Sequence, residues 1–139
     1  MAEPFSENPP FELNKDMTIT HGPLRINFPA VGDPDVNRYT PYHCTNLINN
    51  TQTDLSPSEM ALIMSIDTFV SKTREDISVD FRERLEVSYN ELGIKREIKN
   101  LSHSNFGVLM HKIQKKLGHN FIDYASIGKY KMAEYPKKK

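Results

Sequence analysis

Apolar side chains recur at helical spacing in three stretches of the second half of the chain. The clearest stretch follows Ser102, which is placed to cap the N-terminus of a helix. Leu101 is placed to pack against Phe106, and Gly118 to end the helix in the left-handed conformation. The pattern predicts a helix of about four turns over residues 102–117. The apolar face of this helix consists of Phe106, Leu109, Met110, Ile113 and Leu117.

Two further helices are predicted upstream. The sequence "SPSE", from Ser56 to Glu59, has the spacing of a capping box with proline at the first helical position. Ser78 is placed to cap the next helix, which ends at Gly93. The link "IKREIKN" over residues 94–100 is predicted to be a short strand or a tight turn. The predicted faces are Leu62, Ile63, Ile66, Phe69 and Val70 in the first helix and Phe81, Leu85, Tyr89 and Leu92 in the second.

A β-hairpin is predicted after the last helix. The segments "NFIDYAS" and "KYKMAEY" are rich in aromatic and β-branched residues, and two residues ending in Gly128 separate them. The hairpin is expected over residues 121–135. On its second strand Tyr130 and Met132 share the face toward the helix, and the lysines at 129 and 131 face solvent.

The first half of the chain gives a different prediction. Seven of the nine prolines lie in residues 1–55, where they interrupt every helical pattern. Only "PLRINFP" alternates as a strand does, with Leu24, Ile26 and Phe28 on one side. Three parts are therefore expected: a proline-rich, acidic, extended or irregular arm over 1–54, a domain over 55–136, and a basic tail over 137–139. The fold class is predicted to be mainly α with a small β-hairpin, within the α+β class.

The formal net charge of zero conceals an uneven distribution along the 139 residues. Residues 1–55 carry three basic and seven acidic side chains (−4), residues 56–93 four and eight (−4), and residues 94–139 eleven and three (+8). The basic segment coincides with the last helix and the hairpin, so it is expected to form a surface for a polyanion such as nucleic acid.

The order helix, helix, link, helix, hairpin is typical of the winged-helix variant of the helix-turn-helix. In that arrangement residues 102–117 form the recognition helix and residues 121–135 the wing. Lysines supply most of the affinity through phosphates, while His111 and Gln114 are placed to reach base edges. The predicted nucleic-acid-binding residues are Asn105, His111, Lys112, Gln114, Lys115, Lys116, Lys129 and Lys131.

Two motifs in this region also resemble a known family. "LSHSNFGVLMHKI" and "IGKYKMAEY" resemble the recognition helix and wing of the regulatory factor X DNA-binding domain and of winged-helix modules in viral and phage primase-helicases. The matching features are the Phe106–Gly107 pair and the Lys129–Tyr130 pair, and the resemblance runs from Val79 onward. It implies a winged-helix fold, duplex DNA as ligand, and a role as a viral or phage replication or transcription accessory factor. The arginine-rich strand of regulatory factor X has no counterpart in "GHNFIDYAS".

Enzymatic and metal-binding motifs are not evident in the sequence. Cys44 is the single cysteine and has no acid or second histidine at a spacing that would complete a nucleophilic site with His43, so a buried thiol is expected. The histidines at 103, 111 and 119 recur every eight residues, so that successive ones would point about 80° apart around a helix, and this arrangement does not suit one metal ion. The protein is therefore expected to be neither an enzyme nor a metal or cofactor protein.

Localisation follows from two further features. The chain has no apolar run of membrane-spanning length, and its N-terminus lacks the pattern of a secretory signal. Together with the single cysteine, these features predict an intracellular protein of the cytoplasm or nucleus of a host cell, or of a virion.

One alternative function stays open at this stage. The protein is then a structural or assembly subunit, such as a component of a viral or phage particle, whose N-terminal arm threads onto neighbouring subunits. The two functions differ in their salt dependence. DNA binding weakens steeply as salt rises because counterions are released, whereas assembly through an apolar interface survives.

Overall fold

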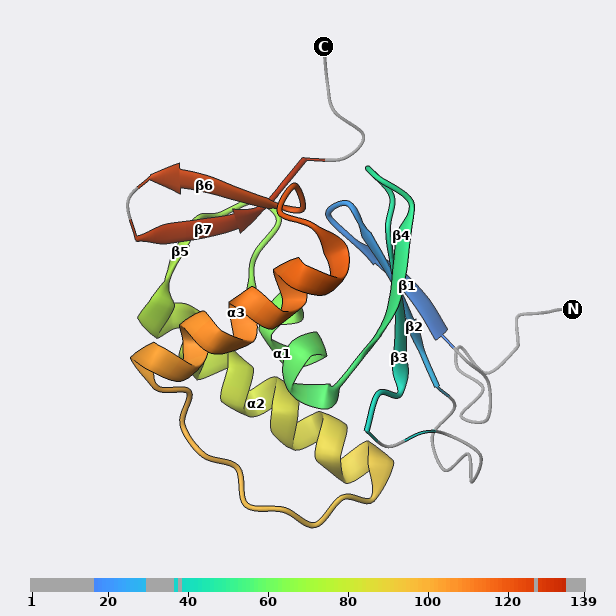
Figure 1. Cartoon of the computed structure of the whole chain (residues 1–139). Coiled ribbons are helices and arrows are strands. Elements are labelled where there is room, and N and C mark those ends of the chain that lie inside the picture. The colour runs from blue at the N-terminus through green and yellow to red at the C-terminus, as the bar shows by residue number, and fades with distance from the viewer. Residues whose placement is uncertain (1–16, 30–36, 38, 127, 135–139) are drawn as a thin grey trace, which may run out of the picture.

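A computed structural model of the chain describes residues 17–29, 37, 39–126 and 128–134. The described part is a mixed α+β fold with three helices and two small antiparallel sheets (Figure 1). The expected α+β class is confirmed, although the β content exceeds one hairpin. In chain order the elements are β1 (Met17–His21), β2 (Leu24–Phe28), β3 (Tyr42–Asn46), β4 (Thr51–Leu55), α1 (Pro57–Ser65), β5 (Lys72–Thr73), α2 (Arg74–Leu92), α3 (His103–Leu117), β6 (Ile122–Ser126) and β7 (Lys129–Met132).

The first sheet has the order β1-β2-β3-β4, with every neighbouring pair antiparallel. Its strands lie within the arm that was expected to be extended or irregular, so the described residues 17–28 and 42–55 form an ordered sheet and not an irregular segment. The expected strand at 24–28 is present, with Leu24 and Ile26 fully buried. The rest of the predicted arm and the basic tail over 137–139 lie outside the described residues.

The described prolines of this region lie between strands. Pro23 is in the turn between β1 and β2, Pro29 follows β2, and Pro41 precedes β3. Proline cannot donate a ladder hydrogen bond, but at these positions none is required. The turn also depends on Gly22, whose φ is +59° and where an added Cβ would lie 2.8 Å from the Met132 Cβ. Prolines therefore divide this region into strands without preventing a sheet.

Helix α1 begins as predicted but is shorter. Ser56 Oγ accepts from Glu59 N, and Glu59 Oε1 accepts from Ser56 N, which completes the capping box. The helix ends at Ser65, so the prediction that Phe69 and Val70 continue its apolar face is wrong. The Asp67 side chain accepts from the backbone N–H groups of both residues and holds them in a turn, where Phe69 is 89% exposed.

Helix α2 begins five residues earlier than predicted. Its N-cap is Thr73, whose side chain accepts from Asp76 N, whereas Ser78 lies inside the helix and donates to the Arg74 carbonyl oxygen. Gly93 ends the helix in the left-handed conformation, as expected. The predicted apolar face is buried throughout, and Ile77 and Ser88 extend it.

The second sheet has the order β5-β7-β6, so the predicted hairpin acquires a third, short strand from before α2. The hairpin turn contains Gly128 with φ +76°. Met132 is buried and Tyr130 half-buried, in agreement with the predicted inner face. The link over 94–100 contains neither strand nor helix, and its isoleucines at 94 and 98 pack against the core.

The first sheet and the three helices share one cluster of buried residues. Tyr42 of β3 hydrogen-bonds to Ser88 of α2, and Leu24 and Cys44 are buried in the same cluster as Phe81 and Ile113. The boundary predicted at residue 54 therefore runs through a continuous core. Whether residues 55–136 fold alone stays a prediction.

Candidate nucleic-acid interface

The local sequence of α3 accounts for its position. Ser102 caps the helix, with its side chain accepting from Asn105 N at 3.1 Å, as predicted. Phe106, Met110, Ile113 and Leu117 are buried and face the core, and Leu101 is half-buried beside them. The opposite side of the helix is consequently exposed along its whole length.

The C-terminal end of α3 is tied to the first sheet. Asn46, which is fully buried on β3, donates to the Leu117 carbonyl oxygen at 2.9 Å and to Asn120 Oδ1 at 2.8 Å. Asn49 donates to the same carbonyl at 3.1 Å. Gly118 has φ 90° and ψ 179°, so the left-handed conformation predicted there is wrong. The two amides satisfy a carbonyl left free at the end of the helix, and so fix α3 on the sheet.

The N-terminal half of α3 is tied to the hairpin by contacts between aromatic rings. The Phe106 ring lies 5.3 Å from the Tyr130 ring, which lies 5.6 Å from the Tyr124 ring. Arg74, the first residue of α2, lies over Phe106 at 5.1 Å and donates to the Tyr130 hydroxyl at 3.3 Å. Its guanidinium also contacts His103. Helix α3 and the hairpin therefore present a joined surface.

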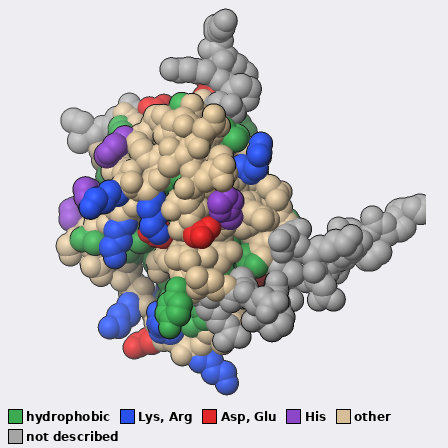
Figure 2. All heavy atoms as spheres, turned by 45° about the vertical axis from the view of Figure 1, so that its right-hand side comes forward, with side chains coloured by type: hydrophobic (Ala, Val, Ile, Leu, Met, Phe, Trp, Pro, Cys, Tyr) green, Lys and Arg blue, Asp and Glu red, His purple; other side chains and the backbone are tan. Residues whose placement is uncertain are grey.

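Three of the predicted nucleic-acid-binding residues lie on the exposed face of α3 opposite the core, which is called the crest below. His111, Lys112 and Lys115 are all exposed, and Asn105 lies exposed near the helix start. Because residues three and four positions apart share a face, Ser104 and Val108 continue the crest toward the N-terminus. Figure 2 shows basic and histidine side chains gathered on the left of that view.

Lys116 is not part of this crest. Its Nζ donates to Glu59 Oε1 at 2.7 Å and to the Asp54 carbonyl oxygen at 3.1 Å. The Glu59 side chain is only 5% exposed, so Lys116 neutralises a buried carboxylate. The phosphate contact at Lys116 stays a prediction, but this cation already has a carboxylate partner, which a local helical pattern does not reveal because Glu59 lies on another helix.

Gln114 is also engaged within the protein. Its amide donates to the Tyr124 hydroxyl at 2.5 Å, which links α3 to β6. On the hairpin Lys129 is exposed, while Lys131 is half-buried and lies opposite Asp123 in the strand register. Lys129 therefore joins the crest residues as a cation exposed to solvent, and Lys131 has a carboxylate as its cross-strand neighbour.

Arg74, His103 and Tyr124 belong to the joined surface of α3 and the hairpin, and the sequence pattern did not indicate them. Arg74 is 56 positions from Tyr130 in sequence, and only the pairing of β5 with β7 brings the two side chains together. Tyr124 is 53% exposed beside Gln114. Its aromatic character was visible in the sequence, but its contact with Gln114 on α3 joins two different elements and depends on the tertiary structure.

Two grooves flank α3 on the side of α1. One, of about 630 Å³, lies at the start of α1 and brings Lys112, Lys115 and Lys116 together with Ser58. The other, of about 290 Å³, lies between α2, the link and α3, and Asn105, Lys99 and Lys112 line it. Lys112 borders both grooves, so it is the cation shared by the two.

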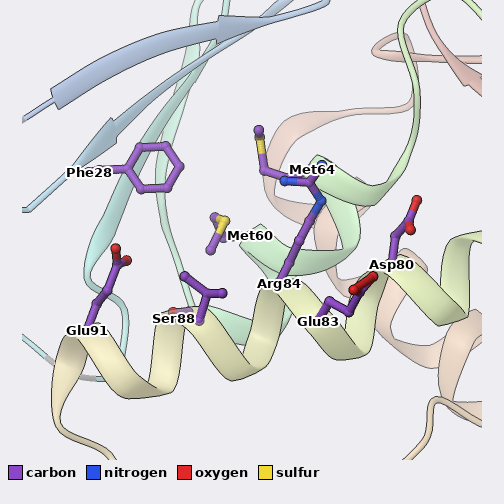
Figure 3. Close-up of a pocket in the computed structure, with 9 residues that line it drawn as sticks. Phe28, Met60, Met64, Asp80, Glu83, Arg84, Ser88 and Glu91 are labelled. Atoms are coloured by element: carbon purple, nitrogen blue, oxygen red, sulfur yellow. The ribbon is translucent and has the colours of Figure 1, made fainter.

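A third cavity has a different chemistry. It measures about 290 Å³ and lies between β2, α1 and α2. Figure 3 shows the Phe28 ring pointing toward Met60 and the Arg84 side chain reaching toward Met64. Glu83 and Glu91 contribute carboxylates, so this cavity does not suit a phosphate.

The described residues offer little for catalysis or metal binding. Cys44 is fully buried, and burial raises the pKa of its thiol to about 12, so it stays protonated at neutral pH. His43, which lies on the other face of β3, hydrogen-bonds to Asp54 Oδ1 at 3.0 Å and to Gln52 Oε1 at 3.2 Å, both on β4. Within the described ranges no three His, Cys, Asp or Glu side chains are grouped to hold a metal ion.

None of the described helices is both long enough and apolar enough to cross a bilayer. Comparisons of the chain with protein-family models, with curated proteins and with solved structures find no match.

Proposed function

We propose that the chain binds duplex DNA in the manner of a winged-helix protein, with α3 as recognition helix and the β6–β7 hairpin as wing. The observation that carries the proposal is the coincidence of topology and charge. The element order α1-β5-α2-α3-β6-β7, with β5 paired to β7, supports the proposal because it is compatible with the order of elements in winged-helix proteins. The crest of its third helix carries His111, Lys112 and Lys115.

The chemistry of the crest suits a DNA groove. Lys112 and Lys115 are exposed cations that neutralise phosphates, which supplies most of the affinity for duplex DNA. His111 offers a ring nitrogen toward base edges, and Val108, 55% exposed, offers an apolar contact of the kind that a thymine methyl accepts. Gln114 takes no direct role here, because its amide is held by Tyr124.

The test is the anisotropy of a labelled duplex of about 20 base pairs, two helical turns, titrated with the full chain at low and moderate salt. The double variant Lys112→Ala/Lys115→Ala is expected to bind at least about tenfold more weakly, with a shallower salt dependence. Its matched control is Lys95→Ala/Arg96→Ala, which removes the same charge from the exposed link beside the C-terminal end of α2. Equal losses for the two double variants would show attraction by net charge alone, and no binding by the unmodified chain would refute the proposal.

The assembly subunit is kept as a second candidate because of one feature of the first sheet. Strand β1 is an edge strand, and no described element pairs with its outer side. Its sequence MTITH has neither proline nor a lysine that would block pairing with another strand. Self-association that persists at high salt, measured by sedimentation, would favour this function over DNA binding.

A further inference from the structure

We infer that Gly107 marks where a sugar–phosphate backbone lies against α3, on the flank that faces the hairpin. The inference rests on the proposed DNA-binding function and adds the docking side to it. It starts from a residue choice that folding does not explain. Gly107 is the fifth residue of α3, inside a continuous helix, where glycine is less favourable than alanine because it loses more conformational freedom on folding.

Packing does not require glycine at this position. A Cβ added to Gly107 would have no protein atom within 4 Å apart from its chain neighbours and the backbone of its own helix. At Gly22 and Gly118, in contrast, an added Cβ would approach another residue to within 3 Å. The backbone conformation does not require it either, because Gly107 is helical. What remains is the open space itself, which leaves the helix backbone accessible from outside the protein.

The surroundings of Gly107 carry hydrogen-bonding groups. His103 and His111 lie one turn before and one turn after it, and both are exposed. The Arg74 guanidinium contacts His103, and the Tyr124 hydroxyl sits next along the flank, held by Gln114. Gly107 is therefore a gap in a row of polar side chains, at which a ligand can approach the helix backbone closely.

The two flanks of α3 offer different contacts. The opposite flank borders the groove of about 630 Å³ lined by lysines, but Leu109 is half-buried there and Lys116 is paired with the buried carboxylate of Glu59. The flank at Gly107 has no side chain between the helix backbone and a ligand. One DNA strand is therefore expected to lie along the joined surface of α3 and the hairpin, with Lys112 and Lys115 left for the other strand.

The experiment compares stability and affinity in the same variants. Gly107→Ala is expected to raise the melting temperature by about 3 to 5 °C, because alanine favours the helix. At the same time it should weaken binding to the labelled duplex by about tenfold, and Gly107→Gln should weaken it further. The control is Asn90→Ala, which improves helix propensity at an exposed position of α2 and should leave affinity unchanged.

Three outcomes separate the inference from the proposed function. Higher stability with lower affinity in Gly107→Ala, but not in Asn90→Ala, supports the inference. Unchanged affinity in both Gly107 variants, while Lys112→Ala/Lys115→Ala still binds weakly, overturns it and leaves the proposed function standing. If the unmodified chain does not bind the duplex, the proposed function fails and the inference falls with it.

Discussion

The substitution Lys116→Met tests whether this lysine serves the fold or a ligand. Methionine keeps most of the aliphatic stem of lysine but removes the ammonium group. In the structure that group donates to Glu59 Oε1 at 2.7 Å and to the Asp54 carbonyl oxygen at 3.1 Å. The variant leaves Glu59 with the backbone N–H of Ser56, at 2.8 Å, as the remaining partner of Oε1.

The expected cost follows from the burial of the pair. A hydrogen bond to a charged group contributes about 1.5–3 kcal/mol, and removal of one partner of a fully buried pair costs about 3–5 kcal/mol. The Glu59 side chain is 5% exposed, but that of Lys116 is 33% exposed, so water reaches the carboxylate once the ammonium is gone. We therefore expect a loss of about 2 kcal/mol in the free energy of unfolding, within the range for a hydrogen bond to a charged group and below that for a fully buried pair.

The assay is urea denaturation at pH 7, with Lys115→Met as the matched control. Lys115 is exposed and adjacent, so its substitution makes the same charge change and is expected to cost less than about 0.5 kcal/mol. In a second step Glu59→Gln, which keeps a side chain suited to the capping box, should recover much of the stability lost in Lys116→Met. Equal stability of the two lysine variants, or no recovery on adding Glu59→Gln, would refute the buried-pair argument.

Two further predictions concern the edges of the core. Burial lowers the pKa of His21 below its ordinary value of 6.5, although the hydrogen bond of its Nε2 to the Ile66 carbonyl oxygen acts in the opposite direction. The unfolded chain therefore binds more protons than the folded protein, and the free energy of unfolding should fall as the pH drops below about 6.5. The urea midpoint should decrease from pH 7.5 to pH 5.5 less in His21→Gln than in the exposed control His111→Gln, and equal decreases would contradict the assignment. Removal of residues 1–55 deletes the sheet that contributes Tyr42 and Leu55 to the core. The remaining chain is expected to lose cooperative unfolding and the dispersion of amide signals in NMR spectra. If the remaining chain is folded, the predicted domain boundary at residue 54 is correct.

The elements that the sequence predicted well are those whose signals are local. The capping box at Ser56 and the N-cap at Ser102 each join residues within one turn, and both are present. The apolar face of α3 and the hairpin around Gly128 also depend on spacing over a few residues. The prediction that Ser78 caps α2 is wrong, because a serine caps a helix only at the residue where the helix begins. Strand β5 pairs with β7 directly before the helix, and the N-cap is its last residue, Thr73.

Strands β3 and β4 of the first sheet were missed because they do not alternate between apolar and polar residues in the usual way. On β3 the inward positions are Tyr42, Cys44 and Asn46, of which the last is polar and fully buried. Strand β4 is the sequence TQTDL, with threonine at its half-buried positions. The burial of Asn46 depends on carbonyl and amide oxygens supplied by residues 117 and 120, which are distant in sequence.

The sequence by itself determined the charge separation along the chain, the three helices and the hairpin, because periodicity, caps and composition are properties of neighbouring residues. It also indicated His111, Lys112 and Lys115, which the structure leaves exposed on α3. Only the tertiary structure decided that Lys116 neutralises Glu59 and that Arg74 joins α3 to the hairpin. These contacts join groups more than 30 positions apart, and the low exposure of the carboxylate, which makes its pairing necessary, exists only once the core has formed.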